Sequence, residues 1–119
     1  MKELKFSKAQ KEILLKALKE NFNSKYSKEL YRQMYHNLSK VDRHFFTTTW
    51  SRGAWICVSS MHEFDKEDEA YNEYETAKLF GKEPEQPMLS KQYKLWHDLE
   101  VRIRAAWDQN RTLEIIFEG

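Results

Sequence analysis

The chain has 119 residues and a formal net charge of +1, with 33% charged and 14% aromatic side chains. These values exclude a disordered chain and argue against a strongly basic nucleic-acid-binding domain, and the length suits one domain with its own core. The single cysteine, Cys57, cannot form an internal disulfide. Lysines interrupt residues 1–20 too often for a signal peptide or a membrane span. We therefore expect one globular domain over residues 1–119, located in the cytoplasm and without membrane contact.

Two helices are predicted in the first third of the chain. Ser7 and Gln10 form a capping box, in which each side chain binds the backbone N–H of the other residue. A second helix follows Ser27 as its N-cap, and both helices carry apolar residues at helical spacing. These apolar residues are Ile13, Leu14, Ala17, Leu18 and Phe22 in the first helix and Leu30, Met34, Leu38 and Val41 in the second.

Residues 44–60 are compatible with two structures. Their three threonines and two tryptophans favour extended chain, and a central Ser-Arg-Gly sequence supplies a glycine for a tight turn. The first prediction is therefore a β-hairpin near residues 45–58. A helix is the alternative, because Phe46, Trp50 and Ala54 are spaced by four residues.

Two further helices are predicted in the second half of the chain. A third helix over residues 61–80 begins with another capping-box pattern, and Gly81 ends it in the left-handed conformation. Two prolines in residues 82–87 make the connection that follows a loop. A fourth helix, with a wide apolar face, runs over residues 90–109, and Asn110 is its expected left-handed terminator.

Residues 112–118 have the alternating pattern of a half-buried strand, with Leu113, Ile115 and Phe117 on one face. The backbone of a strand needs a partner, and the hairpin supplies one. The predicted fold is therefore α+β, with about four helices packed with a small antiparallel three-stranded sheet made of the hairpin and the C-terminal strand. An all-α fold whose terminal strand pairs across a dimer is the alternative.

Charge is distributed unevenly along the chain. Residues 1–52 hold twelve Lys or Arg and five acidic residues, whereas residues 63–86 hold three and nine. On a helical wheel, the acids of the third helix fall on one side and its aromatic residues on the other, so we expect buried tyrosines and an exposed acidic face. Like charges one turn apart destabilise an isolated helix by ~0.2–0.5 kcal/mol per pair. The acidic candidates for partner binding are Asp65, Asp68, Glu69, Glu73 and Glu75.

Three explanations of this acidic face compete. It can be solvated, or it can lie beside the lysines of the first two helices of the same molecule. Alternatively, it can bind a basic groove of another protein by imitating a run of phosphates. Metal binding is not expected, because the carboxylates of residues 65–70 lack the glycine of a calcium loop and lie within a helix.

The basic N-terminal half of the chain favours a different function, direct nucleic-acid binding. Its cations are interleaved with tyrosines that can stack on bases, although acidic residues interrupt the pattern. The candidate residues are Lys25, Lys28, Arg32, Arg43 and Arg52, and Arg52 would lie at the tip of the predicted hairpin.

Motifs for catalysis or cofactor binding are missing from the sequence. Cys57 lies among apolar neighbours, as expected for a small buried side chain, and the four histidines lack the spacing of a metal pair. We therefore hypothesise a small non-enzymatic protein-binding module that uses no metal or cofactor. Its size and composition suggest an anti-defence inhibitor or adaptor of the kind carried by phages or mobile elements, which blocks a host protein. Formation of a homodimer is a further interaction that the sequence allows.

Overall fold

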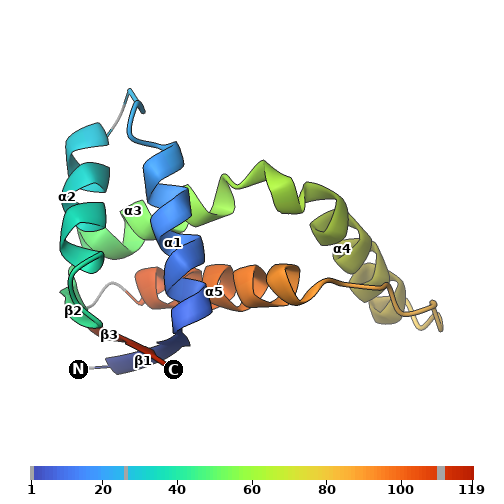
Figure 1. Ribbon diagram of the computed structural model, residues 1–119. Helices are drawn as coiled ribbons and strands as arrows, with labels where there is room; N and C mark the ends of the chain where they lie inside the picture. The colour runs from blue at the N-terminus through green and yellow to red at the C-terminus, as the bar shows by residue number, and fades with distance from the viewer. Residues whose placement is uncertain (1, 26, 110–111) are drawn as a thin grey trace.

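The computed structural model describes residues 2–25, 27–109 and 112–119, which form an α+β fold with helices packed on one face of a three-stranded sheet (Figure 1). The predicted fold class is therefore confirmed. In chain order the elements are β1 (Lys2–Ser7), α1 (Lys8–Glu20), α2 (Lys28–Leu38), β2 (Arg43–Phe46), α3 (Thr48–Ser59), the 3₁₀ turn η1 (His62–Phe64), α4 (Asp65–Leu79), α5 (Lys91–Asp108) and β3 (Leu113–Glu118).

The sheet has the strand order β1-β3-β2, so the C-terminal strand is the central one. β3 pairs in parallel with β1 and antiparallel with β2, and Ile115 lies between Leu4 and His44. The prediction of a purely antiparallel sheet was therefore wrong. Strand β1 was not predicted, because it offers just two alternating apolar residues, Leu4 and Phe6, before the helix begins. Since β3 finds both its partners in its own chain, pairing across a dimer is not needed.

The predicted hairpin near residues 45–58 is also wrong, because residues 48–59 form the helix α3. Thr47 begins this helix as its N-cap, since its side chain accepts a hydrogen bond from the backbone N–H of Trp50 at 3.2 Å. Gly53 makes no turn and is instead buried where α3 crosses α2. A Cβ atom at this position would lie 3.1 Å from Cδ2 of Leu30, so glycine allows a close approach of the two helices.

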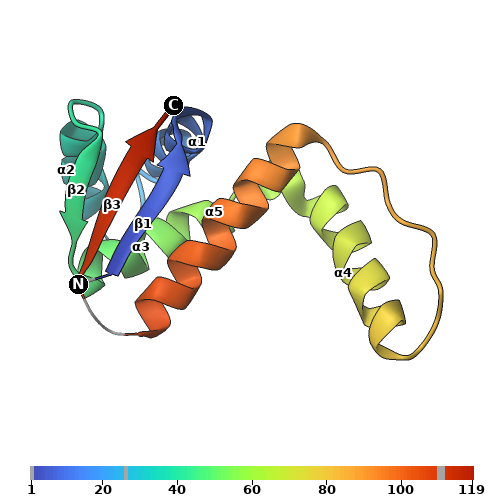
Figure 2. The same cartoon turned by 90° about the horizontal axis from the view of Figure 1, so that it is seen from below.

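The core lies between the helices and one face of the sheet, and α1, α2 and α3 are seen behind the strands in Figure 2. Leu14, Leu18, Leu38, Leu99 and Ile115 are completely buried in it. The first helix, α1, begins as predicted at the capping box: Ser7 Oγ accepts from the N–H of Gln10 at 3.1 Å. Helix α5 begins at Ser90, whose hydroxyl accepts from the N–H of Tyr93 at 3.0 Å. Local side-chain chemistry thus sets where these helices start.

Helix α4 and the segment that returns from it project from the rest of the molecule, and we call residues 62–90 the arm (Figures 1 and 2). The radius of gyration is 15.3 Å, whereas a compact domain of this length would have about 13.5 Å. Gly81 ends the arm helix with φ +76°, in the left-handed conformation that was predicted. The predicted terminator Asn110 lies outside the described residues.

Helix α4 contains no fully buried residue. The expectation that this helix buries its tyrosines was therefore wrong, since Tyr71 and Tyr74 are half-buried. Tyr71 contacts Tyr93 and His97 of α5, whereas Tyr74 lies beside Pro84 and Pro87 of the returning segment. A helix that buries so little within its own chain has a surface left over for contact with something else.

Candidate functional site

An aromatic cluster fixes the base of the arm to the body. Trp96 of α5 is 5% exposed, and its indole N–H donates to the carbonyl oxygen of Val58 at 2.8 Å. The ring of Phe64, in η1, stacks on Trp96 with centroids 5.1 Å apart. Tyr71 of α4 contacts His97 of α5, with ring centroids at 4.8 Å. The arm is therefore held at its base by rings from three elements.

Some of the acidic side chains of α4 have structural partners. The hydroxyl of Tyr93 donates to Asp68 at 2.8 Å, and burial together with the nearby Asp68 carboxylate raises the pKa of this tyrosine well above its usual range. Glu67 accepts from both the backbone N–H and the hydroxyl of Ser90, at 2.7 and 3.0 Å, and so ties α4 to the start of α5. Asp68, a predicted site residue, thus has a role in holding the arm.

Of the remaining acidic candidates, Asp65, Glu69 and Glu73 are exposed on the arm, whereas Glu75 is half-buried. Asp65 contacts Nδ1 of His62 at 3.2 Å. Glu69, Glu73 and Glu75 form no hydrogen bond or ion pair within the described part of the chain. Helix α4 therefore presents carboxylates that have no cationic partner among the described residues.

Three of the four lysines of the first helix, Lys8, Lys11 and Lys16, bind acids outside this acidic face. Lys8 and Lys11 both bind the carboxylate of Asp42, which lowers the pKa of that group. Lys16 Nζ lies 3.0 Å from Glu63 Oε2 at the base of the arm, and this ion pair joins α1 to the arm without reaching the acidic face. The explanation that the acidic face pairs with the protein's own lysines therefore fails for Glu69 and Glu73.

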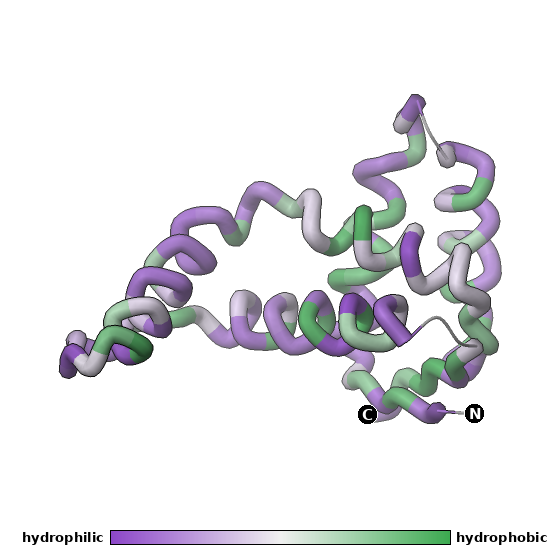
Figure 3. Tube along the Cα trace, turned by 180° about the vertical axis from the view of Figure 1, so that it is seen from behind, coloured by the Kyte–Doolittle hydropathy of each residue, from purple (hydrophilic) through white to green (hydrophobic). Residues whose placement is uncertain are grey.

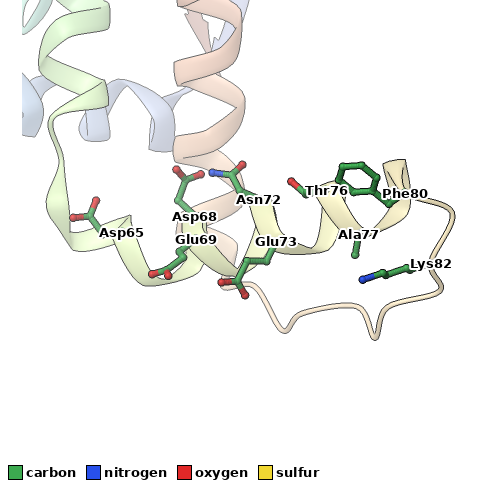
Figure 4. Close-up of a pocket in the computed structure, with 9 residues that line it drawn as sticks. All are labelled: Asp65, Asp68, Glu69, Asn72, Glu73, Thr76, Ala77, Phe80 and Lys82. Carbon is green, nitrogen blue, oxygen red and sulfur yellow. The ribbon is translucent and has the colours of Figure 1, made fainter.

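A shallow groove of 720 Å³ follows the exposed side of α4 (Figure 4). Glu69 and Glu73 lie one turn apart along it, and Phe80 lies at its far end. Leu79 and Phe80 are 85% and 77% exposed, and these two residues form an apolar patch at the end of the arm that we call the tip. Met88 is 98% exposed but lies in the returning segment, two residues before Ser90 at the base of the arm. The apolar end of the arm is visible in Figure 3. Lys82 lines the same groove but forms no ion pair with these carboxylates in the described structure. The arm thus combines unpaired acid with exposed apolar side chains.

The tip was not among the surfaces predicted from the sequence. Leu79 and Phe80 lie directly before Gly81, where the predicted helix ends, and nothing in the local pattern shows that they lack a neighbour. A signal was nevertheless present, because the proline-containing segment that follows offers few apolar residues against which these two could pack.

The basic candidates are spread over several elements. Arg43 of β2 binds Glu114 at 3.2 Å, and the guanidinium of Arg32 lies 5.8 Å from the centre of the Phe22 ring. Lys25 and Lys28 are exposed before and at the start of α2. Arg52 lies on α3, so its predicted place at a hairpin tip is wrong. The five residues do not form one continuous row in the structure.

Cys57 is completely buried in α3, and burial raises the pKa of its thiol to about 12. We expect no reaction of the native protein with a thiol reagent such as DTNB at about pH 8, because the thiolate is the reactive species. Full reaction should follow when denaturant unfolds the chain, which serves as the control. Rapid labelling of the folded protein would contradict the buried position of Cys57.

His97 and Asp98 have separate partners. The ring of His97 lies against Tyr71 and Tyr93, whereas the carboxylate of Asp98 binds Arg102 and the side-chain amide of Gln10, both at 2.7 Å. Within the described ranges, no three His, Cys, Asp or Glu side chains are grouped so that they could hold a metal ion.

Comparison of the chain with protein-family models, with curated proteins and with solved structures finds no significant match. Of the helices in the described part of the chain, none combines the length and the apolar character that crossing a membrane requires. Arguments about function therefore rest on the molecule's own surfaces.

Proposed function

We propose that this protein is a non-enzymatic binding module whose arm recognises another protein through a basic surface on that partner. The observation that supports the proposal is helix α4, which has no fully buried residue and projects from the body with unneutralised carboxylates. Inhibition of a nucleic-acid-binding protein, as hypothesised from the sequence, is a specific form of this proposal.

The partner's chemistry follows from the two parts of the arm. Glu69 and Glu73 are one turn apart, about 6 Å along the helix, and such a line of negative charge favours Lys and Arg on the partner and repels nucleic acid. The tip, formed by Leu79 and Phe80, adds apolar surface of the kind that is buried at the centre of protein interfaces. Acid and apolar surface together favour a protein partner with a basic groove that has an apolar end.

Reversing the charge of the arm should abolish partner binding. The double variant Glu69→Lys with Glu73→Lys is expected to lose the proteins that the tagged wild type captures from nuclease-treated lysate of its source organism. The physical reason is that two cations would face the partner's own Lys and Arg at close range. Both residues are exposed and lack structural partners, so circular dichroism should show an unchanged fold.

A matched control changes the net charge equally at another place. Glu12 of α1 and Glu29 of α2 are exposed and form no ion pair in the described structure, so Glu12→Lys with Glu29→Lys should leave capture intact. Equal capture by the arm variant and the wild type would refute the proposal. Equal loss in both double variants would show that net charge alone determines binding, which would also refute a specific role of the arm.

A further inference from the structure

A second cleft, of 670 Å³, is lined by residues of α2 and α3. Figure 1 shows these two helices on the side of the molecule away from α4. Its apolar side is formed by Leu30, Tyr31 and Ile56. Gly53 lies among them and brings α2 close to α3, because a Cβ atom there would lie 3.1 Å from Leu30 Cδ2 and 3.4 Å from Tyr31 Cε1. The cleft therefore has a firm apolar floor built from two packed helices.

The other side of the cleft is polar and carries positive charge. Arg52 lines it and forms no hydrogen bond or ion pair with any residue that the structure describes. Ser27 and Thr49 also line it, and the Ser27 side chain makes no capping bond to α2, of which it is the N-cap, but interacts with the Tyr31 hydroxyl. Among the described lining residues there is no Asp or Glu. This contrasts with the groove on the arm, where carboxylates dominate.

These features together define a ligand class. A guanidinium without a carboxylate partner binds an oxyanion through two parallel N–H donors, and nearby hydroxyls can donate to the remaining oxygens. The volume falls within the range of about 300–1,000 Å³ that is usual for small-molecule sites, which combine apolar walls with a few polar groups. We propose that the cleft binds a small organic oxyanion, a phosphate or carboxylate attached to an apolar ring, with the anion at Arg52 and the ring against Leu30 and Ile56.

This site is independent of the proposed function of the arm. Its residues belong to α2, α3 with its C-cap Ser60, and the segment between α1 and α2, whereas the acidic face and the tip belong to residues 62–90. The Glu69→Lys with Glu73→Lys variant should therefore bind the small anion as the wild type does, so the failure of one proposal does not affect the other.

The test uses the whole protein and four probes that separate the two parts of the ligand. Phenyl phosphate and benzoate each carry a ring and an anion, phenol carries the ring alone, and inorganic phosphate carries the anion alone. In amide NMR titrations we expect saturable shifts at Leu30, Gly53 and Ile56 with at least one of the two ring anions. Phenol and inorganic phosphate should bind about tenfold more weakly, because each lacks one half of the interaction.

Two arginine variants decide whether Arg52 holds the anion. Arg52→Gln should weaken binding of the ring anion about tenfold and leave phenol unaffected. Arg32→Gln is the matched control, because Arg32 lies against Phe22 and does not line the cleft. The proposal is overturned if neither ring anion binds at millimolar concentration, if phenol or inorganic phosphate binds as tightly as the ring anion, or if Arg52→Gln binds like the wild type.

Discussion

Replacing Trp96 with alanine is expected to lower the free energy of unfolding by about 3–5 kcal/mol, a large part of the stability of a single domain. Trp96 is 5% exposed, donates a hydrogen bond to Val58 and stacks on Phe64, so its loss leaves a cavity where α3, α5 and the base of the arm meet. Chemical denaturation followed by far-UV circular dichroism measures the change.

The control for Trp96→Ala is Trp107→Ala on the same helix. Trp107 is half-buried and stacks on Trp55 with ring centroids 5.1 Å apart, so its removal should cost clearly less. Equal losses in the two variants would contradict the assignment of Trp96 as the anchor of the arm. A loss below about 1 kcal/mol for Trp96→Ala would do the same.

Replacing Ile115 with alanine is the second change with a large expected effect, about 2–5 kcal/mol. Ile115 is completely buried in the central strand and lies between residues of β1 and β2, so the cavity would open in the middle of the sheet. Thermal and denaturant unfolding, both followed by circular dichroism, should report the same decrease in stability.

The adjacent residue gives a matched control in the same strand. Glu114 lies on the opposite face of β3 and pairs with Arg43, and the side chains of the two residues are 19% and 64% exposed. Because the pair is partly open to solvent, Glu114→Ala should cost about 1 kcal/mol. If the two alanine variants were equally destabilised, the alternation of faces described for β3 would be wrong.

Much of the fold was predictable where local chemistry determines it. The starts of α1 and α5 follow from Ser7 and Ser90, whose side chains satisfy backbone N–H groups within three residues of themselves. The end of the arm helix follows from Gly81, because glycine adopts a positive φ without steric cost. Such signals depend on neighbours in the sequence and so can be recognised without a structure.

The sheet was predicted less well because its pairing depends on distant residues. The three threonines and two tryptophans of residues 44–60 favour a strand by propensity, but their packing against α1 and α5 selects a helix. Thr47 was a local helix signal in that segment, since it is an N-cap. Strand β1 is specified mainly by its partner β3, which no local pattern reveals.

The candidate site was predictable in its charge but not in its details. The sequence placed the acids on one side of the arm helix. The structure shows that some of these acids have a hydrogen-bond partner and others have none. Asp68 binds Tyr93, whereas Glu69 and Glu73 have no partner in the described chain. Which acids have a partner depends on how α4 packs against α5. The spacing of the acids along the sequence does not predict this.

The central position of β3 affects how the protein can fold during synthesis. Strand β1 pairs with a strand that lies more than a hundred residues later in the chain, as shown by the register of Lys2 with Leu113. Contacts so distant in sequence close a long loop and therefore form slowly, whereas the helices can form early from local contacts. During synthesis, Leu4 and Phe6 therefore have no partner strand until residues 113–118 have left the ribosome. Glu3 and Lys5 flank these apolar residues. Their charges would oppose pairing of the unpaired strand with other chains.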